Sequence, residues 1–218
     1  GLVVERPRGV VFSKTTGFRH DCIEPGKEAI RKLGQERGFE TTFTEDSQEF
    51  IAQLATADVA LFLCTTGDVL NEDQQGAMEA FVRAGGGYVG LHSASDTEYD
   101  WPWYGKLVGG YFKSHPAIQQ ASVKVEDRAH PTSCSLPDYW DRVDEWYDFR
   151  ANPRPGVRVL ASLVPSSYQG STMTDDHPIM WCQEFEGGRS WYSGFGHTQA
   201  TYMEKFFLDS LAEAINWT

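Results

Sequence analysis

Short apolar runs alternate with amphipathic segments along the first ninety residues of the chain. The apolar runs predict four strands, at residues 10–12, 39–43, 59–63 and 88–91. The segments between them carry apolar residues at helical spacing and predict helices at residues 23–33, 48–54 and 72–83. Because the strands are apolar throughout, we expect an α/β fold with a mainly parallel sheet and helices on both of its faces.

The alternation is lost between about residues 96 and 176. Two stretches rich in aromatic residues and glycine, at 101–104 and 109–112, are typical of loops or short helices. The remaining elements that we expect are strands at 121–125 and 157–163, a hairpin of 179–185 with 190–195, and a closing helix at 201–215. Because no repeat or long linker divides the chain, we predict one α/β domain over residues 1–218 with an elaborated middle.

The chain has 218 residues and a formal net charge of −12. A field of that sign repels phosphate backbones and anionic lipids, so we expect neither nucleic acid nor a membrane as partner. No apolar stretch is long enough for a transmembrane helix. The cysteines lack a CxxC spacing, which argues against a thiolate zinc site and a disulfide-exchange protein. They are Cys22, Cys64, Cys134 and Cys182, and their pairing stays open.

The numbered chain begins at Gly1 without Met, from which we expect a processed or trimmed form. The acidic balance, the low lysine content and a glycosylation sequon at residues 216–218 favour an extracellular or periplasmic protein, with a cytoplasmic one as the alternative. A disulfide between any two of the cysteines would support this prediction, whereas four free buried thiols would oppose it.

Polar clusters follow three of the predicted strands, at residues 17–21, 64–68 and 92–96. In an open parallel sheet, ligands bind outside the carboxyl ends of the strands, so we expect a site for a small-molecule ligand at this edge. The expected substrate-binding residues of these clusters are Arg19, Thr65, Thr66 and Ser93. The alternative for Ser93 is that it caps the following helix.

The six histidines lie at predicted strand ends or before prolines. His20 and His92 belong to the polar clusters, and His197 lies between the last strand and the last helix. The others precede proline, which restricts their backbone, and they are His115, His130 and His177. Neutral imidazoles bind divalent metals, among which we expect zinc. The predicted ligands are His20, His92, His115 and His197, although each alone is also typical of a hydrogen-bonded histidine.

Residues 144–147 read Asp-Glu-Trp-Tyr and place a carboxylate beside aromatic side chains. An apolar setting raises a carboxyl pKa, which would suit Glu145 to proton transfer, although a solvated Glu on a strand is the alternative. We expect Glu145, Asp96 and His115 to surround a cleft that holds His20, His92 and His197. The aromatic candidates for stacking on a sugar are Trp101, Trp103 and Tyr147, which would otherwise pack on one another.

Several ordered motifs resemble the ThuA-like family of trehalose-utilisation proteins. They are Lys14-Thr15-Thr16-Gly17-Phe18-Arg19-His20, Gly85-Gly86-Gly87-Tyr88-Val89-Gly90-Leu91-His92-Ser93, Asp144-Glu145-Trp146-Tyr147, His177-Pro178 and Gly196-His197-Thr198. The resemblance covers roughly residues 8 to 217. It implies a flavodoxin-like sandwich similar to the class I glutamine amidotransferases, and a link to the catabolism of trehalose and other disaccharides beside sugar dehydrogenases, with a small sugar or oligosaccharide as ligand.

The comparison with amidotransferases argues against glutaminase activity. Their nucleophilic cysteine follows a strand, and the matching position here is His92, which cannot form the thioester. Their triad histidine matches His197, but Gln199 stands where the carboxylate usually follows. An esterase that uses Ser93 is not expected either, because the Gly-x-Ser-x-Gly elbow is absent.

Two functions are therefore considered. The first is an enzyme that acts on a disaccharide or glycoside, for example a 3-keto form, through proton transfer assisted by histidine and metal, by elimination or hydrolysis. Its predicted catalytic residues are His92, His197, Glu145 and Asp96. The second is a carbohydrate-binding accessory domain without turnover, which the aromatic middle and the missing nucleophile favour.

Overall fold

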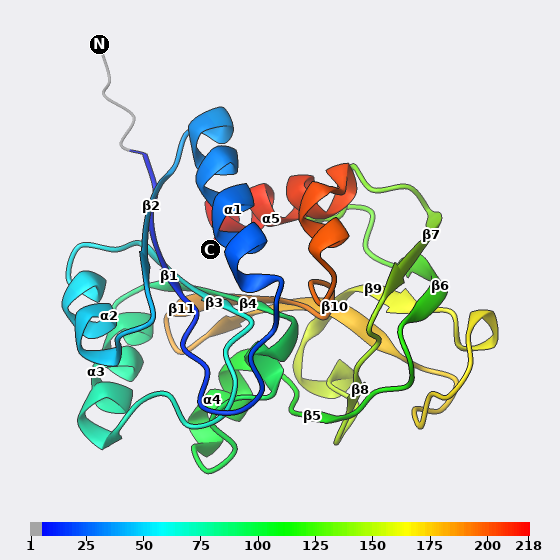
Figure 1. The fold of residues 1–218 in the computed structure, drawn as a ribbon, viewed down its shortest axis with the longest axis horizontal. Helices are drawn as coiled ribbons and strands as arrows, with labels where there is room; N and C mark the ends of the chain where they lie inside the picture. The colour runs from blue at the N-terminus through cyan, green and yellow to red at the C-terminus, as the bar shows by residue number, and fades with distance from the viewer. Residues whose placement is uncertain (1–5) are drawn as a thin grey trace.

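A nine-stranded sheet crosses the centre of the molecule (Figure 1). The computed structural model describes residues 6–218, so residues 1–5 of the predicted domain lie outside the described part. The strand order is β2-β1-β3-β4-β11-β10-β9-β6-β7. The parallel strands are β2 (Glu40–Thr44), β1 (Arg8–Phe12), β3 (Val59–Leu63), β4 (Gly87–Leu91) and β11 (Gly188–Ser193). The antiparallel strands are β10 (Pro178–Phe185), β9 (Arg158–Leu163), β6 (Gln119–Val125) and β7 (Tyr139–Asp144).

Helices cover both faces of this sheet. The α-helices are α1 (Ile23–Arg37), α2 (Ser47–Leu54), α3 (Glu72–Arg83), α4 (Pro102–Val108) and α5 (Lys205–Trp217). In Figure 1, α1 and α5 lie on one side of the sheet, and α2, α3 and α4 lie on the other. The short strands β5 (Phe112–Ser114) and β8 (Asp148–Phe149) form a separate ribbon, and the 3-10 helices are η1 (His92–Ser95), η2 (Arg154–Gly156), η3 (Pro165–Ser167) and η4 (Gln199–Met203).

The apolar pattern accounts for the parallel half of the sheet. Every residue of β3 and of β4 is buried, as expected for strands covered on both faces. Strand 59–63 and helix 72–83 coincide with their predicted bounds, and the remaining elements of the first ninety residues differ by at most four residues at an end. The predicted α/β fold is confirmed: its mixed sheet has a mostly parallel core, to which antiparallel strands are added on one side.

The middle of the chain extends the sheet with antiparallel strands, which the sequence analysis placed only in part. Strand β7 was not predicted, because three of its six residues are charged and its sequence contains no apolar run. The closing helix begins at Lys205 rather than near Thr201, because residues 199–203 form η4, which Thr198 caps by accepting a hydrogen bond from the Thr201 amide.

The part of the chain that the structure describes contains no helix long and apolar enough to cross a membrane. None of the four cysteines, all of which lie in that part, forms a disulfide. Cys22, Cys64 and Cys182 are buried, and Sγ of Cys22 lies 3.7 Å from Sγ of Cys64. The extracellular or periplasmic location therefore stays a prediction without support from a disulfide.

Candidate metal centre

Four side chains that can ligate a metal converge at the carboxyl edge of the parallel strands. They are His20, His92, Glu145 and His197, and one ligand atom from each lies within 4.8 Å of those of the others. The ring of His20 has its centroid 5.1 Å from that of His92 and 5.1 Å from that of His197, and the latter two centroids are 5.3 Å apart. The structure thus brings together the three histidines that the strand ends suggested.

The topology explains this convergence. His92 follows β4 directly, and His197 follows β11, which pairs with β4 in parallel. His20 lies on the loop that leaves β1, a third strand with the same direction. Because parallel strands end at one edge, residues distant in sequence meet there. Glu145 comes from a different source, the end of the antiparallel strand β7.

His92 occupies a strained backbone conformation. Its φ of 50° lies in the left-handed region, which costs a non-glycine residue on the order of 1 kcal/mol or more and is frequent at functional sites. The carbonyl of His92 accepts hydrogen bonds from the hydroxyls of Tyr192 at 2.6 Å and Ser95 at 3.1 Å. The imidazole stacks on the ring of Tyr147, with centroids 3.9 Å apart. These contacts fix the direction of a fully buried side chain.

The orientation of His92 sets two lone-pair atoms against each other. Nδ1 lies 2.8 Å from the carbonyl oxygen of Gly194, which can only accept, so this nitrogen carries a proton and donates. In the neutral ring, Nε2 then presents a lone pair to Oε1 of Glu145, 3.3 Å away. A second proton on His92 or a cation between the two atoms removes this repulsion.

His197 presents a similar unsatisfied atom. Its Nδ1 lies 3.2 Å from the same Oε1 of Glu145, yet it is buried and has no hydrogen-bond partner in the described structure. Buried polar atoms without partners cost free energy, and they are rare in proteins. Both His92 and His197 thus direct a ring nitrogen at one carboxylate oxygen.

Burial and mutual repulsion keep two of the histidines neutral. Burial, together with the neighbouring imidazoles, lowers the pKa of His20 to about 3. Burial also lowers the pKa of His197. Burial acts in the same direction on His92, but the hydrogen bond to Glu145, nearby negative charge and the hydrogen bond to the Gly194 carbonyl together outweigh burial, so the net pKa of His92 is raised. Neutral imidazoles are the form that binds metals.

The expectation that an apolar setting raises the pKa of Glu145 is wrong. Burial does push this pKa up, but the hydrogen bond and the positive charge of protonated His92, with weaker contributions from the other histidines, together outweigh burial, so the net pKa lies below the usual value. Glu145 is therefore ionised at neutral pH and suited to hold a cation.

A buried ion pair organises the loops around the cluster. Oδ1 of Asp144 accepts hydrogen bonds from the amides of Glu145 at 2.9 Å and His197 at 3.1 Å, and Oδ2 accepts one from the Gly196 amide at 3.0 Å. Arg142 donates to Oδ2 of Asp144 at 2.8 Å, and both side chains are buried. Sequence reasoning assigned no role to either residue, although Asp144 precedes Glu145 within a quoted motif.

Of the hydroxyl groups expected to bind a ligand, that of Ser93 lies at the cluster, and those of Thr65 and Thr66 form hydrogen bonds to other loops. Ser93 lies at the cluster, with Oγ 3.4 Å from Nδ1 of His20. The hydroxyls of Thr65 and Thr97 are 2.9 Å apart, and that of Thr66 donates to the Phe18 carbonyl at 2.8 Å and accepts from the Gly17 amide at 3.2 Å. The structure thus uses the two threonines to tie loops together.

The rim of the cluster carries the other expected residues. His115 is half exposed, and its Nε2 lies 3.6 Å from Oε2 of Glu145, so it stands outside the four-residue set in which it was predicted as a ligand. Tyr147 contacts His92 and lies among the buried residues. The Asp96 carboxylate accepts a hydrogen bond from Tyr99, and burial raises the pKa of Asp96.

Three expected substrate-binding residues are engaged elsewhere. Trp101 and Trp103 stack on each other with centroids 5.2 Å apart, and Nε1 of Trp103 donates to Glu186. Glu186 lies in the turn before β11, at the opposite end of the parallel strands from His92. Arg19 is exposed and forms an ion pair with Glu45.

The two remaining histidines have structural partners. His177 is buried between the carbonyl of Tyr147 and the hydroxyl of Tyr168, at 2.8 Å from each. His130 is buried against the hydroxyl of Thr132, also at 2.8 Å. Both lie outside the four-residue cluster.

Solved structures with a similar fold include two ThuA-like proteins. One, from Bacteroides uniformis, has a TM-score of 0.81 and 23% identity, over 100% of this chain and 94% of its own. The other, from Parabacteroides merdae, has a TM-score of 0.81 and 17% identity, over 98% of this chain and 90% of its own. A β-galactosidase from Bacillus circulans matches 94% of this chain with 30% of its own, at a TM-score of 0.61 and 15% identity.

These likenesses show the fold alone, because fewer than a quarter of the aligned residues are identical. A search of curated protein sequences found no relative of this chain. The family model described as ThuA, trehalose utilisation, matches residues 8–218, which is nearly the whole chain. The chain therefore belongs to the ThuA family of trehalose-utilisation proteins.

Proposed function

We propose that this protein is a metal-dependent enzyme that acts on a disaccharide or glycoside by proton transfer, with zinc as its metal. The observation that carries the proposal is the set of three histidines and one glutamate whose ligand atoms lie within 4.8 Å of one another. Imidazole and carboxylate groups are ordinary zinc ligands. Membership in a trehalose-utilisation family supports a carbohydrate as substrate.

Two details of the side chains fit a bound cation. The partnerless Nδ1 of His197 and the lone-pair contact between His92 and Glu145 would both be satisfied by a positive ion between them. The hydrogen bond from Nδ1 of His92 to the Gly194 carbonyl is the kind of contact that usually orients a metal-ligating histidine. His20, His92, His197 and Oε1 of Glu145 would hold the ion.

Zinc bound there would act as a Lewis acid on a carbonyl or hydroxyl oxygen of the sugar. Proton transfer then falls to the residues beside the ligands. Nδ1 of His115 donates to the Pro116 carbonyl at 2.9 Å, so Nε2, which lies 3.6 Å from Oε2 of Glu145, is the nitrogen that can accept a proton. Asp96, whose pKa burial raises, holds a proton to higher pH than an exposed carboxyl and can donate it.

A 3-keto glycoside suits these groups. The carbonyl at C3 acidifies the proton at C2, and removal of that proton expels the substituent at C1. In our proposal His115 takes up the C2 proton, and Asp96 gives a proton to the departing oxygen. His92 and His197 serve as ligands rather than as the acid and base.

Elemental analysis of the purified, zinc-reloaded protein tests the metal. We expect about one zinc ion per chain, and a loss of at least roughly tenfold in zinc affinity in each of the variants His20→Ala, His92→Ala and His197→Ala, since a ligand is removed. Circular dichroism would verify that each variant is folded. Wild-type protein that binds no zinc, or folded variants that all bind it normally, would overturn the metal proposal.

Turnover is tested with trehalose and its 3-keto derivative, with release of the monosaccharides followed by chromatography. We expect cleavage of the 3-keto sugar only by the zinc-loaded protein. Saturable binding of these sugars without any turnover would instead favour the carbohydrate-binding accessory domain.

A further inference from the structure

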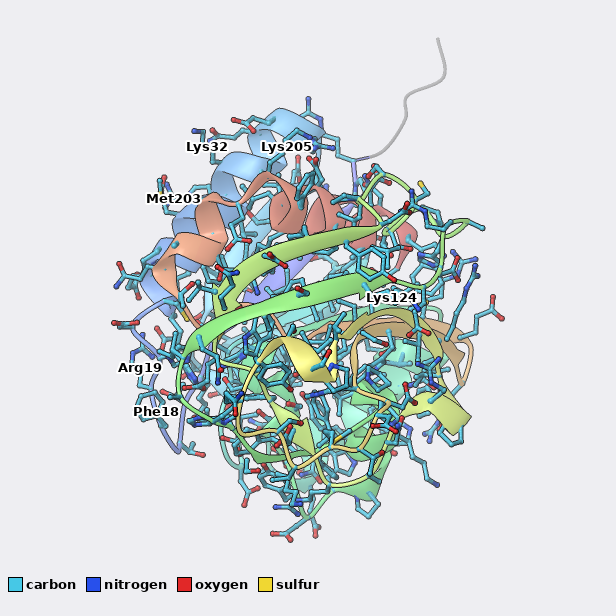
Figure 2. The ribbon with its side chains drawn as sticks, turned by 90° about the vertical axis from the view of Figure 1, so that its right-hand side faces the viewer. Phe18, Arg19, Lys32, Lys124, Met203 and Lys205 are labelled. Carbon is cyan, nitrogen blue, oxygen red and sulfur yellow. The ribbon has the colours of Figure 1, made fainter. Side chains whose placement is uncertain are left out.

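An exposed aromatic ring stands beside the candidate metal centre. Phe18 is 66% exposed, and its ring lies 4.9 Å from the ring of His20 at nearly a right angle. Figure 2 shows Phe18 next to Arg19 at the periphery of the molecule, on the loop that leaves β1. Phe18 belongs to one of the motifs that resemble the ThuA-like family, and its position in the sequence predicted no role for it.

The loop that carries Phe18 is held in place. The Phe18 carbonyl accepts a hydrogen bond from the Thr66 hydroxyl, which in turn accepts one from the Gly17 amide. The Thr16 amide donates to the Thr66 carbonyl at 2.9 Å. These hydrogen bonds to Thr66, which follows β3, fix the backbone that carries the ring and hold Phe18 beside His20.

A role of Phe18 in shielding His20 from solvent does not explain why the Phe18 side chain is so exposed. His20 is 5% exposed, and one edge of a side chain suffices to shield it, yet most of the Phe18 ring remains in contact with solvent. An exposed aromatic ring beside a group of polar side chains combines the apolar and polar surfaces from which ligand-binding sites are built. The other exposed aromatic residues that the structure describes, Tyr139 and Phe206, lie on β7 and α5, away from the four-residue cluster.

We propose that Phe18 is a stacking platform that binds the apolar C–H face of a pyranose ring at the metal centre and thereby selects cyclic sugars. This inference rests on the proposed function, because it needs a sugar whose polar groups reach the histidine cluster. The platform supplies the apolar side of the site, which Trp101 and Trp103 were expected to supply and which their mutual stacking precludes.

The test compares a cyclic and an open-chain ligand by calorimetry on zinc-loaded protein. The probes are methyl α-glucopyranoside and sorbitol, which share hydroxyl groups but differ in the presence of a ring. The variants are Phe18→Leu, which still covers His20 without a flat face, and Phe18→Trp, which keeps the face. Phe206→Leu serves as the matched control at an exposed aromatic elsewhere.

We expect Phe18→Leu to weaken binding of the glucopyranoside by about fivefold to tenfold, as expected for a lost aromatic stack, and to leave sorbitol binding and zinc content unchanged. Phe18→Trp and Phe206→Leu should bind the glucopyranoside as the wild type does. In turnover of 3-ketotrehalose, Phe18→Leu should raise KM by a similar factor and leave kcat within about twofold.

Two results would overturn the inference, and they are distinguishable. If the wild type binds the glucopyranoside and Phe18→Leu binds it equally well, Phe18 is a cover for His20 and the proposed function stands. If the zinc-loaded wild type binds neither the glucopyranoside nor 3-ketotrehalose, the inference and the proposed function fail together. Equal weakening of glucopyranoside and sorbitol would show a general disturbance of the site and would also contradict a stacking platform.

Discussion

Nε2 of His92 lies 3.3 Å from Oε1 of Glu145, while the opposite nitrogen of the same ring donates to the carbonyl of Gly194. A carboxylate and an imidazole lone pair in this arrangement attract a cation. Nδ1 of His197 lies 3.2 Å from the same Oε1, so this oxygen is close to a ring nitrogen of each of the two histidines. The relationship makes Glu145 the most informative residue of the centre.

Glu145→Gln should therefore lower zinc affinity. The amide keeps the shape of the side chain but removes the negative charge, and we expect a loss of roughly 10-fold to 100-fold. Competition with a chromogenic chelator would measure it. Glu184→Gln is the matched control, because Glu184 is an exposed glutamate on β10, away from the centre. Unchanged affinity in Glu145→Gln would exclude the carboxylate as a ligand.

Zinc binding should release about one proton per ion near pH 6 rather than three. His20, with a pKa lowered to about 3, and His197, with a lowered pKa, are already neutral there, and the carboxyl of Glu145, whose pKa is also lowered, is ionised. His92 alone has a raised pKa and gives up a proton. Zinc affinity should consequently fall as pH drops through the pKa of His92.

Calorimetry in buffers of different ionisation enthalpy would count the released protons. A release of two protons at this pH would show that either His20 or His197 is protonated in the free protein, and a release of three would show that both are. Either result would contradict the effect of burial on the rings concerned.

Asp144→Asn should destabilise the fold and the centre together. The substitution removes the buried carboxylate that pairs with Arg142, whose guanidinium then keeps the partly exposed Glu204 as a partner, and it weakens the hydrogen bonds to the Glu145 and His197 amides. We expect a loss of about 3–5 kcal/mol in the free energy of unfolding, measured by urea denaturation. Asp141→Asn, at an exposed position of the same strand, should cost well under 1 kcal/mol.

His115→Ala should separate turnover from metal binding. His115 reaches Oε2 of Glu145 from the rim and lies outside the four-residue cluster, so zinc content should stay at the wild-type level. Turnover of 3-ketotrehalose should fall by at least roughly 100-fold, the effect of losing a general base. Loss of zinc from this variant would instead identify His115 as a ligand, as the sequence analysis expected.

The apolar pattern was sufficient for the parallel half of the fold and for part of the site. Continuous apolar runs are buried strands wherever helices cover both faces, so β3 appears at its predicted bounds. The helical spacing of apolar residues likewise predicted the bounds of α3. Parallel strands end at one edge, and this rule alone suggested that His20, His92 and His197 meet. These inferences depend on local sequence and on a general property of parallel sheets.

Tertiary structure decided the rest, because it depends on contacts between residues far apart in the chain. Trp101 and Trp103 have the composition of a sugar-binding stretch, but α4 turns them toward each other at the other end of the sheet. Arg142 and Asp144 anchor the centre only because β7 forms the edge of the sheet and aligns Asp144 with the loop before α5. Local sequence patterns do not predict such contacts between distant residues. The sequence by itself therefore determined which side chains follow the parallel strands, and only the folded chain determined which carboxylate and which aromatic ring join them.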